Sequence, residues 1–334
     1  MGKLVEASWA PSTKVSYTSY LKRWEKYCEL HELDMYKATV TEGADFLSHL
    51  FDQGEKYGYI AGARSALSSV LPVVGGLTFG KQEVVSRLLR GVFKERPSFP
   101  KNIVTWDPHI VLEWMVKLGR NEDLLMEDLT GKLCTLLCLL SGQRAQIVPA
   151  LDTRFMVAEV SRYVFDVRKI LKTTKPSKHI PPLEFLAFPE EENLCIVRCL
   201  DEYLGRTDAM REIVCMVDED EIDKDAGYKD AENKNEQSFP KPLILSHSSP
   251  YGPVSPATAA RYVKLFLGEA GIDLTVFTAH STRSASTSLG NNLGMTFADI
   301  AKSAGWRQES TFQRFYRKPI MRNLGDTIMK SFRK

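Results

Sequence analysis

The segment from residue 277 to 319 constrains this chain more than any other, because it gathers four side chains that suit the binding of an anion. It holds a His-x-x-Arg motif formed by His280 and Arg283, followed by Trp306 and Tyr316. An imidazole, a guanidinium, an indole N–H and a phenol can all donate hydrogen bonds. Each also has an ordinary explanation, since His-x-x-Arg pairs occur at helix starts and aromatic side chains fill cores. The motif therefore indicates a site only if residues elsewhere in the chain complete it.

The length of 334 residues is enough for two domains with separate cores. Hydrophobic residues make up 43% of the chain, which is ordinary for a globular protein, and no run approaches the roughly 20 apolar residues of a membrane span. The first residues also lack the apolar stretch of a secretory signal. These features predict a protein that is neither membrane-bound nor secreted.

The six cysteines do not form the framework of a disulfide-rich protein. Cys134 and Cys138 stand four residues apart in an apolar segment, as do Cys195 and Cys199, and no histidine follows at metal-ligand spacing. We expect reduced, buried thiols in an intracellular protein, with neither a metal site nor another cofactor.

Charge is unevenly distributed along the chain. Residues 218–236 contain nine acidic residues and three lysines, a composition typical of a solvated or disordered loop. We place this acidic insert at about 217–238. The net charge of +2 therefore hides a more basic remainder, as binding to a phosphate backbone requires.

Apolar periodicity predicts four helices in the first hundred residues. The first opens with Ser12 or Thr13 as its N-cap, the second is capped by Thr41, and the other two carry apolar stripes over residues 60–71 and 84–93. Basic side chains outside these stripes are candidate DNA contacts, although a solvated helix face would have the same composition. They are Lys14, Lys22, Arg23, Lys26, Arg87 and Arg90.

Prolines at 97, 100 and 108 interrupt helical continuation, so we place a domain boundary after residue 100. The second domain begins with helices, one of which ends near Leu140. Strand-like stretches then cover residues 155–160, 163–171, 180–188 and 243–245, and helices return from Ser255 onwards. The predicted fold class is mainly α with a small β-sheet, divided into domains of residues 1–100 and 101–334.

Breaking and rejoining a phosphodiester without a metal would need fixed donors around the non-bridging oxygens, where negative charge develops. Arg283 and Arg144 offer permanently charged, planar forks for phosphate. Trp306 would add one N–H donor, and His280 would donate to the phosphate or accept a proton from the nucleophile.

Tyr316 is the candidate nucleophile in this scheme. A tyrosine normally ionises near pH ~10, so nearby cations and a base would have to help deprotonate it. The covalent phosphotyrosine would retain the energy of the broken bond, and rejoining would need no ATP. The departing 5′ oxygen needs a proton, which Lys172 or Lys175 on the predicted hairpin could supply.

The order of these motifs resembles that of the tyrosine recombinases, the phage-integrase family. The resemblance rests on Ser141-Gly142-x-Arg144, Lys172-Thr173, His280-x-x-Arg283, Gly305-Trp306 and Tyr316. The N-terminal helices resemble that family's core-binding, SAM-like domain, so the resemblance covers nearly the whole chain. The segments around Lys172, Cys195 and His280 are most similar to recombinases of eukaryotic mobile elements of the Crypton and DIRS kinds.

This resemblance implies a site-specific DNA recombinase that integrates or transposes DNA through a 3′-phosphotyrosine, without metal or ATP. It implies a helical catalytic domain with a small sheet, a clamp around double-stranded DNA, and a homotetramer on paired sites. The expected location is the nucleus in a eukaryote and otherwise the cytoplasm. The implied catalytic set is Arg144, Lys172, His280, Arg283, Trp306 and the nucleophile Tyr316, with Lys175 as a further DNA contact.

Two features depart from the family pattern. Ile147 stands where many members carry an acidic residue that supports the first arginine. Gln146, the preceding residue, is the candidate for a neutral substitute that supports Arg144. Trp306 and Tyr316 lie ten residues apart, one more than the commonest family spacing.

Two other functions fit the same fold. One is a domesticated DNA-binding protein without catalysis, which the complete catalytic set argues against. The other is a type IB topoisomerase, which the N-terminal domain argues against. A helical protein with coincidental motifs is the third explanation. The motifs leave open whether Tyr316 acts in its own subunit's site or in a neighbour's.

Overall fold

The computed structural model describes residues 9–98, 103–171, 174, 179–216, 241–248 and 251–321. The chain divides into two compact units, Met1–Pro100 and Lys101–Lys334. Both candidate proton donors, Lys172 and Lys175, and the acidic insert lie outside the described residues. None of the helices in the described ranges has the length and apolar character needed to cross a bilayer.

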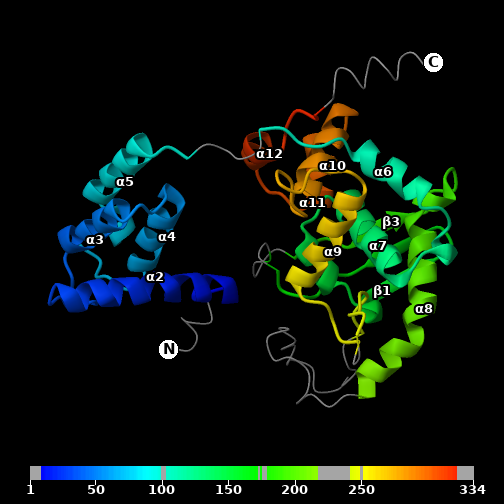
Figure 1. Cartoon of the computed structure of the whole chain (residues 1–334), viewed down its shortest axis with the longest axis horizontal. Coiled ribbons are helices and arrows are strands. Elements are labelled where there is room, and N and C mark those ends of the chain that lie inside the picture. Colours follow the sequence, from blue (N-terminus) through cyan, green and yellow to red (C-terminus); the bar gives the residue numbers. More distant parts are fainter. Residues whose placement is uncertain are drawn as a thin grey trace. The chain divides into compact units, whose positions relative to one another are not determined.

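The described part of the first unit is built from helices (Figure 1). They are α2 (Pro11–Leu30), α3 (Val40–Asp52), α4 (Tyr57–Leu67) and α5 (Glu83–Glu95), with the short 3-10 helix η1 (Phe79–Lys81) before α5. Trp24, Phe46, Ile60 and Phe79 are almost fully buried at the centre of this unit. The four predicted helices are therefore confirmed.

Two of the predicted helix caps in this unit are wrong. Ala10 is the N-cap of α2, and Pro11 occupies the first helical turn, where the missing N–H of proline costs nothing. Thr39, rather than Thr41, caps α3, because its hydroxyl accepts from the Glu42 N–H while the Glu42 carboxylate accepts from the Thr39 N–H. This reciprocal capping box fixes the helix start two residues earlier.

The second unit surrounds the buried helix α7 (Met126–Ser141), which packs against the helices α8, α9 and α10. The other helices of the unit are α6 (Pro108–Lys117), α8 (Ile196–Met216), α9 (Pro256–Glu269), α10 (Ser281–Asn292), α11 (Phe297–Ala304) and α12 (Glu309–Phe315). Short 3-10 helices are η2 (Asn121–Asp123), η3 (Ala145–Ala150), η4 (Thr153–Phe155) and η5 (Glu192–Leu194). In Figure 1, α10, α11 and α12 lie together in this unit.

The unit also contains a small antiparallel sheet, with strand order β1 (Met156–Glu159), β2 (Arg162–Phe165) and β3 (Leu183–Leu186). Arg162 pairs with Leu186, and Phe165 pairs with Leu183, so β2 and β3 form the predicted hairpin but are shorter than predicted. The predicted fold class, mainly α with a small sheet, is confirmed.

The predicted strand at residues 243–245 is wrong, because this segment makes only isolated bridges at its edges. The Arg211 side chain donates to the carbonyls of Pro242 and Leu243, and the Leu245 N–H donates to the Tyr203 hydroxyl. Side chains of α8 thus satisfy backbone groups that a neighbouring strand would otherwise pair.

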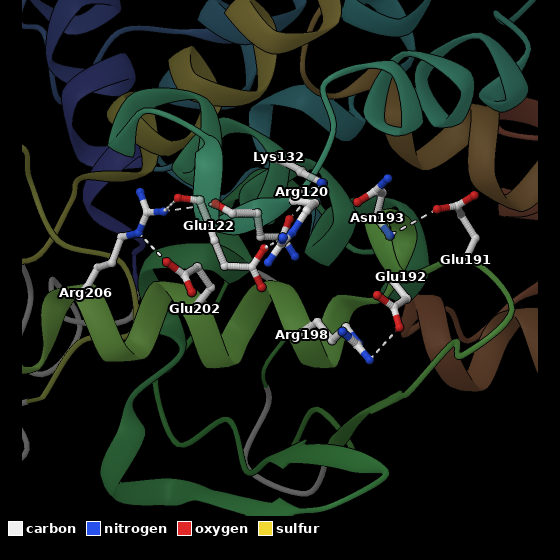
Figure 2. A network of polar contacts seen from close by, with 10 residues as sticks. Arg120, Glu122, Lys132, Glu191, Glu192, Asn193, Arg198, Glu202 and Arg206 are labelled. Carbon is white, nitrogen blue, oxygen red and sulfur yellow. Dashed lines mark hydrogen bonds and ion pairs between the residues drawn. The ribbon is translucent and has the colours of Figure 1, made fainter.

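Polar contacts fix α8 to the segment that precedes α7 (Figure 2). Arg206 donates to the carbonyls of Asn121, Glu122 and Leu124, and the fully buried Lys132 donates to Asn121 Oδ1 at 2.8 Å. Burial lowers the pKa of Lys132. This network holds the outer helix α8 against α7, the helix that leads into the candidate site.

Candidate active site

The end of α7 positions Arg144. Gly142 closes the helix in the left-handed conformation, at φ 62°, a region that glycine enters without steric cost. The turn is anchored from α11, because Ser303 Oγ donates to the Ser141 carbonyl and Gln143 Nε2 donates to the Ser303 carbonyl. Arg144 then follows as the N-cap residue of η3, partly buried and outside the apolar core of α7.

Replacing Gly142 by alanine is expected to lower the free energy of unfolding by about 1–2 kcal/mol, because an L residue is strained at this φ. The new Cβ would also lie 3.2 Å from Thr287 Cγ2. Urea unfolding of both proteins measures the difference. Gly119→Ala is the matched control for backbone strain alone, since Gly119 also has a positive φ, 86°, but has open space around the added Cβ. A Gly142→Ala protein as stable as the wild type would contradict this account of the turn.

The start of α10 carries His280 and Arg283, the first as the N-cap residue and the second in the first turn. The imidazole of His280 is on the exposed side of the site, whereas Arg283 is fully buried. Unpaired N–H groups give a helix start a partial positive charge. The His-x-x-Arg motif thus places its two side chains at a helix end that favours anions.

Trp306 and Tyr316 also stand at helix ends. α11 ends at a second left-handed glycine, Gly305 at φ 71°, and Trp306 follows it directly. α12 ends at Phe315, and Tyr316 is its C-cap residue. Each catalytic candidate that the structure describes therefore lies at or next to the end of a helix.

The Tyr316 hydroxyl is the point at which these elements meet. Arg144 Nη2 donates to Tyr316 Oη at 3.1 Å, and His280 Nε2 lies 3.4 Å from the same oxygen. The imidazole and phenol rings are 6.0 Å apart and nearly perpendicular. Residues separated by more than 170 positions in the sequence thus converge on one phenol.

Arg283 lies beneath this phenol. Its Nη1 donates to the Gly142 carbonyl at 2.9 Å, and its guanidinium carbon lies 4.3 Å from the Trp306 ring centre and 5.1 Å from that of Tyr316. Burial, together with the neighbouring Arg144 cation, lowers the pKa of Arg283 to about 10. Among the ion pairs of the described residues, neither guanidinium takes part in one. Two cations held close together without a carboxylate favour the binding of an anion.

Three buried N–H-bearing atoms at this site have no hydrogen-bond partner within the described residues. They are Nε and Nη2 of Arg283 and Nε1 of Trp306. An unsatisfied buried donor costs about 1–3 kcal/mol, so folded proteins rarely keep several together without a ligand. Both side chains lie against the Tyr316 ring, and a group with several acceptor oxygens would satisfy their donors.

Part of the ordinary explanation for the aromatic residues also holds. Trp306 and Tyr316 belong to a small apolar cluster with Phe312, Ile300 and Ala304, separate from the main core of the unit. The Trp306 ring centre lies 5.2 Å from Phe312 and 4.7 Å from Tyr316. The rings therefore fill a core, while the Tyr316 hydroxyl accepts from Arg144 and the Arg283 guanidinium lies over the Trp306 ring.

Two further positions from the sequence analysis are Lys172 and Ile147. Lys172 lies outside the described residues, so its role stays a prediction. Ile147, at the position that is acidic in many recombinases, is buried in the main core of the unit. It is thus a packing residue, and carries no charge that could orient Arg144.

The candidate DNA contacts of the first unit differ in their exposure and in their ion pairs. Lys22, Lys26 and Arg87 are exposed on α2 and α5. Arg90 is also exposed but pairs with Glu83 at 3.1 Å. The partly buried Arg23 pairs with Glu55 and lies over the Tyr59 ring. Lys14 is on α2 and is partly buried. The remaining candidate, Lys175 of the second unit, lies outside the described residues. Arg23 is therefore less available to DNA than the sequence pattern indicated.

A shallow groove of about 400 Å³ opens next to His280. Its lining includes Arg261 and Lys264, both exposed on α9, and Thr278 from the segment before α10. Sequence analysis did not predict these two basic residues as DNA contacts. The groove gives the site a cationic border on one side.

Ser288 on α10 is another residue that sequence analysis missed. Its Oγ donates to the Tyr316 carbonyl at 2.8 Å and accepts from the Lys318 N–H at 3.0 Å. Serines are frequent in α10, but nothing in their spacing indicates which of them contacts the Tyr316 segment.

The fold is that of the tyrosine recombinases and integrases, since solved structures of this class match the chain along nearly its whole length. A lambda integrase dimer bound to a COC′ core site has a TM-score of 0.54 at 14% sequence identity, covering 96% of this chain and 94% of the other. The integrase of transposon Tn1549 in complex with circular intermediate DNA has a TM-score of 0.55 at 13% identity, covering 99% and 97%.

The XerH site-specific recombinase bound to its palindromic difH substrate is similar as well, with a TM-score of 0.56 at 13% identity, covering 95% of this chain and 78% of the other. A scan against protein-family models gives no match, and neither does a comparison with curated protein sequences. The predicted likeness to tyrosine recombinases is thus confirmed at the level of the fold.

Proposed function

We propose that this chain is a site-specific DNA recombinase that cleaves and rejoins DNA through a covalent bond between Tyr316 and a 3′ phosphate. The observation that carries the proposal is the convergence of Arg144, His280 and Arg283 on one phenol, beside buried donors that have no partner among the described residues. A phosphodiester would supply the negative charge and the acceptor oxygens for these groups.

In the proposed reaction, Tyr316 Oη attacks the scissile phosphorus and the 5′ oxygen leaves. One phosphodiester is exchanged for another, so the reverse attack by a 5′ hydroxyl rejoins the strand. Arg144 and Arg283 hold the non-bridging oxygens, and Trp306 Nε1 donates to one of them. His280, 3.4 Å from Oη, accepts the phenol proton or donates to the phosphate.

The leaving 5′ oxygen needs a proton, which we assign to Lys172. Lys172→Ala is expected to slow cleavage by about 10²–10⁴-fold, the usual range for loss of a general acid. Lys175→Ala, the matched control three residues away, is expected to have a smaller effect. Single-turnover cleavage rates measure both, and a larger loss in Lys175→Ala would transfer the role to Lys175. A substrate with sulfur in place of the 5′ bridging oxygen needs no such proton and should restore the rate of Lys172→Ala.

The first unit is proposed to act as the core-binding domain. Exposed Lys22, Lys26 and Arg87 would neutralise DNA phosphates, and Arg261 and Lys264 would do the same next to His280. The lambda integrase structure holds a dimer on its core site. For this chain we propose a homotetramer on paired sites, and a mobile element of the Crypton or DIRS kind as its source.

The experiment that tests this function is a search for a covalent adduct. Duplexes bound by the full chain are selected from a random-sequence pool and nicked near the centre. They are then incubated with the protein in a buffer that contains a chelator of divalent metal ions. We expect a product that resists denaturation and is removed by protease. A bound duplex that never forms an adduct would instead identify a DNA-binding protein without catalysis. Adduct formation with relaxation of supercoiled DNA, but no exchange between paired sites, would identify a topoisomerase.

A further inference from the structure

The backbone around Tyr316 is fastened to α10 on both sides of the tyrosine. Ser288 is 1% exposed, and its hydroxyl both donates to the Tyr316 carbonyl at 2.8 Å and accepts from the Lys318 N–H at 3.0 Å. One buried hydroxyl therefore uses its donor and an acceptor on backbone groups two residues apart.

A second attachment holds the residues that follow. The Thr105 N–H donates to the Pro319 carbonyl at 2.9 Å, and the Thr105 carbonyl accepts from the Met321 N–H at 2.6 Å. Thr105 also forms a parallel bridge with Ile320 and is fully buried. The segment from Tyr316 to residue 321 is thus attached to its own chain at two successive points.

One side of α10 runs along both of these segments. Ser281, Ser284 and Ser288 are spaced at three and four residues, so they lie on one side of the helix. Ser281 Oγ accepts from Trp106 Nε1 at 2.8 Å, and Ser284 Oγ lies 3.5 Å from Thr105 Oγ1. This side of α10 meets the Thr105 segment and the Tyr316 segment.

These contacts matter for reactivity because α12 ends at Phe315. Tyr316 is the first residue outside that helix, and its own N–H still bonds to the Phe312 carbonyl at 2.9 Å. The helix hydrogen bond on one side and Ser288 on the other together define where the phenol stands. α10 also carries His280 and Arg283, so Ser288 ties the nucleophile to the helix that binds the phosphate.

From this geometry we infer that Ser288 is a positioning residue that aligns Tyr316 for attack within its own subunit. The inference rests on the proposed function, because it assigns the Ser288 contacts to a reaction at Tyr316. Displacement of a reacting group by about 1 Å can cost on the order of a hundredfold in rate without weakening binding. Ser288 therefore acts on cleavage and not on DNA affinity.

The test compares Ser288→Ala, Ser288→Thr and the control Ser284→Ala in the full chain. Ser284 is also a buried serine of α10, but its hydroxyl donates to the Ser281 carbonyl of the same helix and otherwise lies 3.5 Å from Thr105 Oγ1, not beside the Tyr316 backbone. On the selected nicked duplex, Ser288→Ala should cleave about a hundredfold more slowly with unchanged Kd. Ser288→Thr, which keeps the hydroxyl, should restore most of the rate, and Ser284→Ala should cleave like the wild type.

A measurement without DNA keeps the inference independent of catalysis. Hydrogen exchange of the Lys318 amide should quicken about tenfold or more in Ser288→Ala and stay unchanged in Ser284→Ala, because only the first loses the acceptor of that N–H. Unchanged exchange, or an unchanged cleavage rate in Ser288→Ala, would overturn the inference while leaving the proposed function intact. If the wild type forms no adduct, the proposed function is contradicted. Hydrogen exchange of the Lys318 amide would then still show whether Ser288 holds this segment.

Subunit mixing tests the second part of the inference. Tyr316→Phe and Arg144→Ala chains, combined on one paired substrate, should form no adduct if each tyrosine attacks in its own subunit. Adduct on the Arg144→Ala chain would mean that its tyrosine serves an intact site of a neighbour, and would overturn attack within the subunit.

Discussion

The Tyr316→Phe variant is expected to form no covalent adduct with DNA while binding the same duplex with the affinity of the wild type. The substitution removes only the hydroxyl, which is the attacking atom in the proposed reaction. Loss of a nucleophile costs about 10⁶-fold in turnover in well-studied hydrolases, so no adduct should be detectable. The phenylalanine ring keeps the contacts of Tyr316 with Trp306 and Phe312, and the fold of the small aromatic cluster should survive.

Denaturing gels measure the adduct, and a filter or fluorescence titration measures the affinity. Tyr262→Phe is the matched control, because Tyr262 is another buried tyrosine of the same unit and the substitution keeps the ring that stacks on His247 with centres 5.0 Å apart. It should form adduct at the rate of the wild type. An adduct that persists in Tyr316→Phe would show that another residue is the nucleophile.

Helical elements could largely be predicted from the sequence, because local patterns encode them. Apolar periodicity predicted α2 to α5, and the Ser255 start of α9 is confirmed by the hydroxyl of Ser255 accepting from the Thr258 N–H. The motif residues Arg144, His280, Arg283, Trp306 and Tyr316 meet at one place, which no local pattern requires. Their order along the chain was informative only through the resemblance to recombinases.

The errors in the sequence analysis come from contacts that distant residues decide. Residues 243–245 are apolar enough for a strand, but Arg211 on α8 donates to the Leu243 carbonyl, and no strand forms there. Arg23 had the spacing of a DNA contact, but Glu55, far along the chain, binds it. Ser288 resembles every other serine of α10 until the Tyr316 segment is placed beside it. In each case the partner lies far away in sequence, so periodicity carries no information about it.

The same limit explains why burial of Arg283 was not predicted. Arginine is usually exposed, and a fully buried one needs partners for its donors. Here the Gly142 carbonyl takes one N–H and the Trp306 ring covers one face, whereas Nε and Nη2 have no partner within the described residues. The cost of this arrangement is acceptable in a protein that binds an anion there, and the buried fork is the feature that most separates this site from a solvated helix end.

The second large effect is therefore expected for Arg283→Lys. Lysine keeps the positive charge but loses the planar fork, so one ammonium cannot serve both the Gly142 carbonyl and the phosphate. Because loss of one oriented donor costs about 10²–10³-fold in turnover, and this change affects more than one donor, we expect cleavage to fall by about 10³-fold or more. Single-turnover adduct formation on the selected duplex measures the rate, and thermal unfolding checks that the variant is folded.

Arg314→Lys is the matched control, because Arg314 is exposed on α12 over the Phe315 ring. This substitution also replaces a guanidinium by an ammonium group, but outside the site. It should cleave like the wild type. A folded Arg283→Lys protein with wild-type cleavage would mean that charge alone suffices at this position. The partnerless Nε and Nη2 would then have no part in holding the phosphate, and the chemistry would rest on Arg144 and His280.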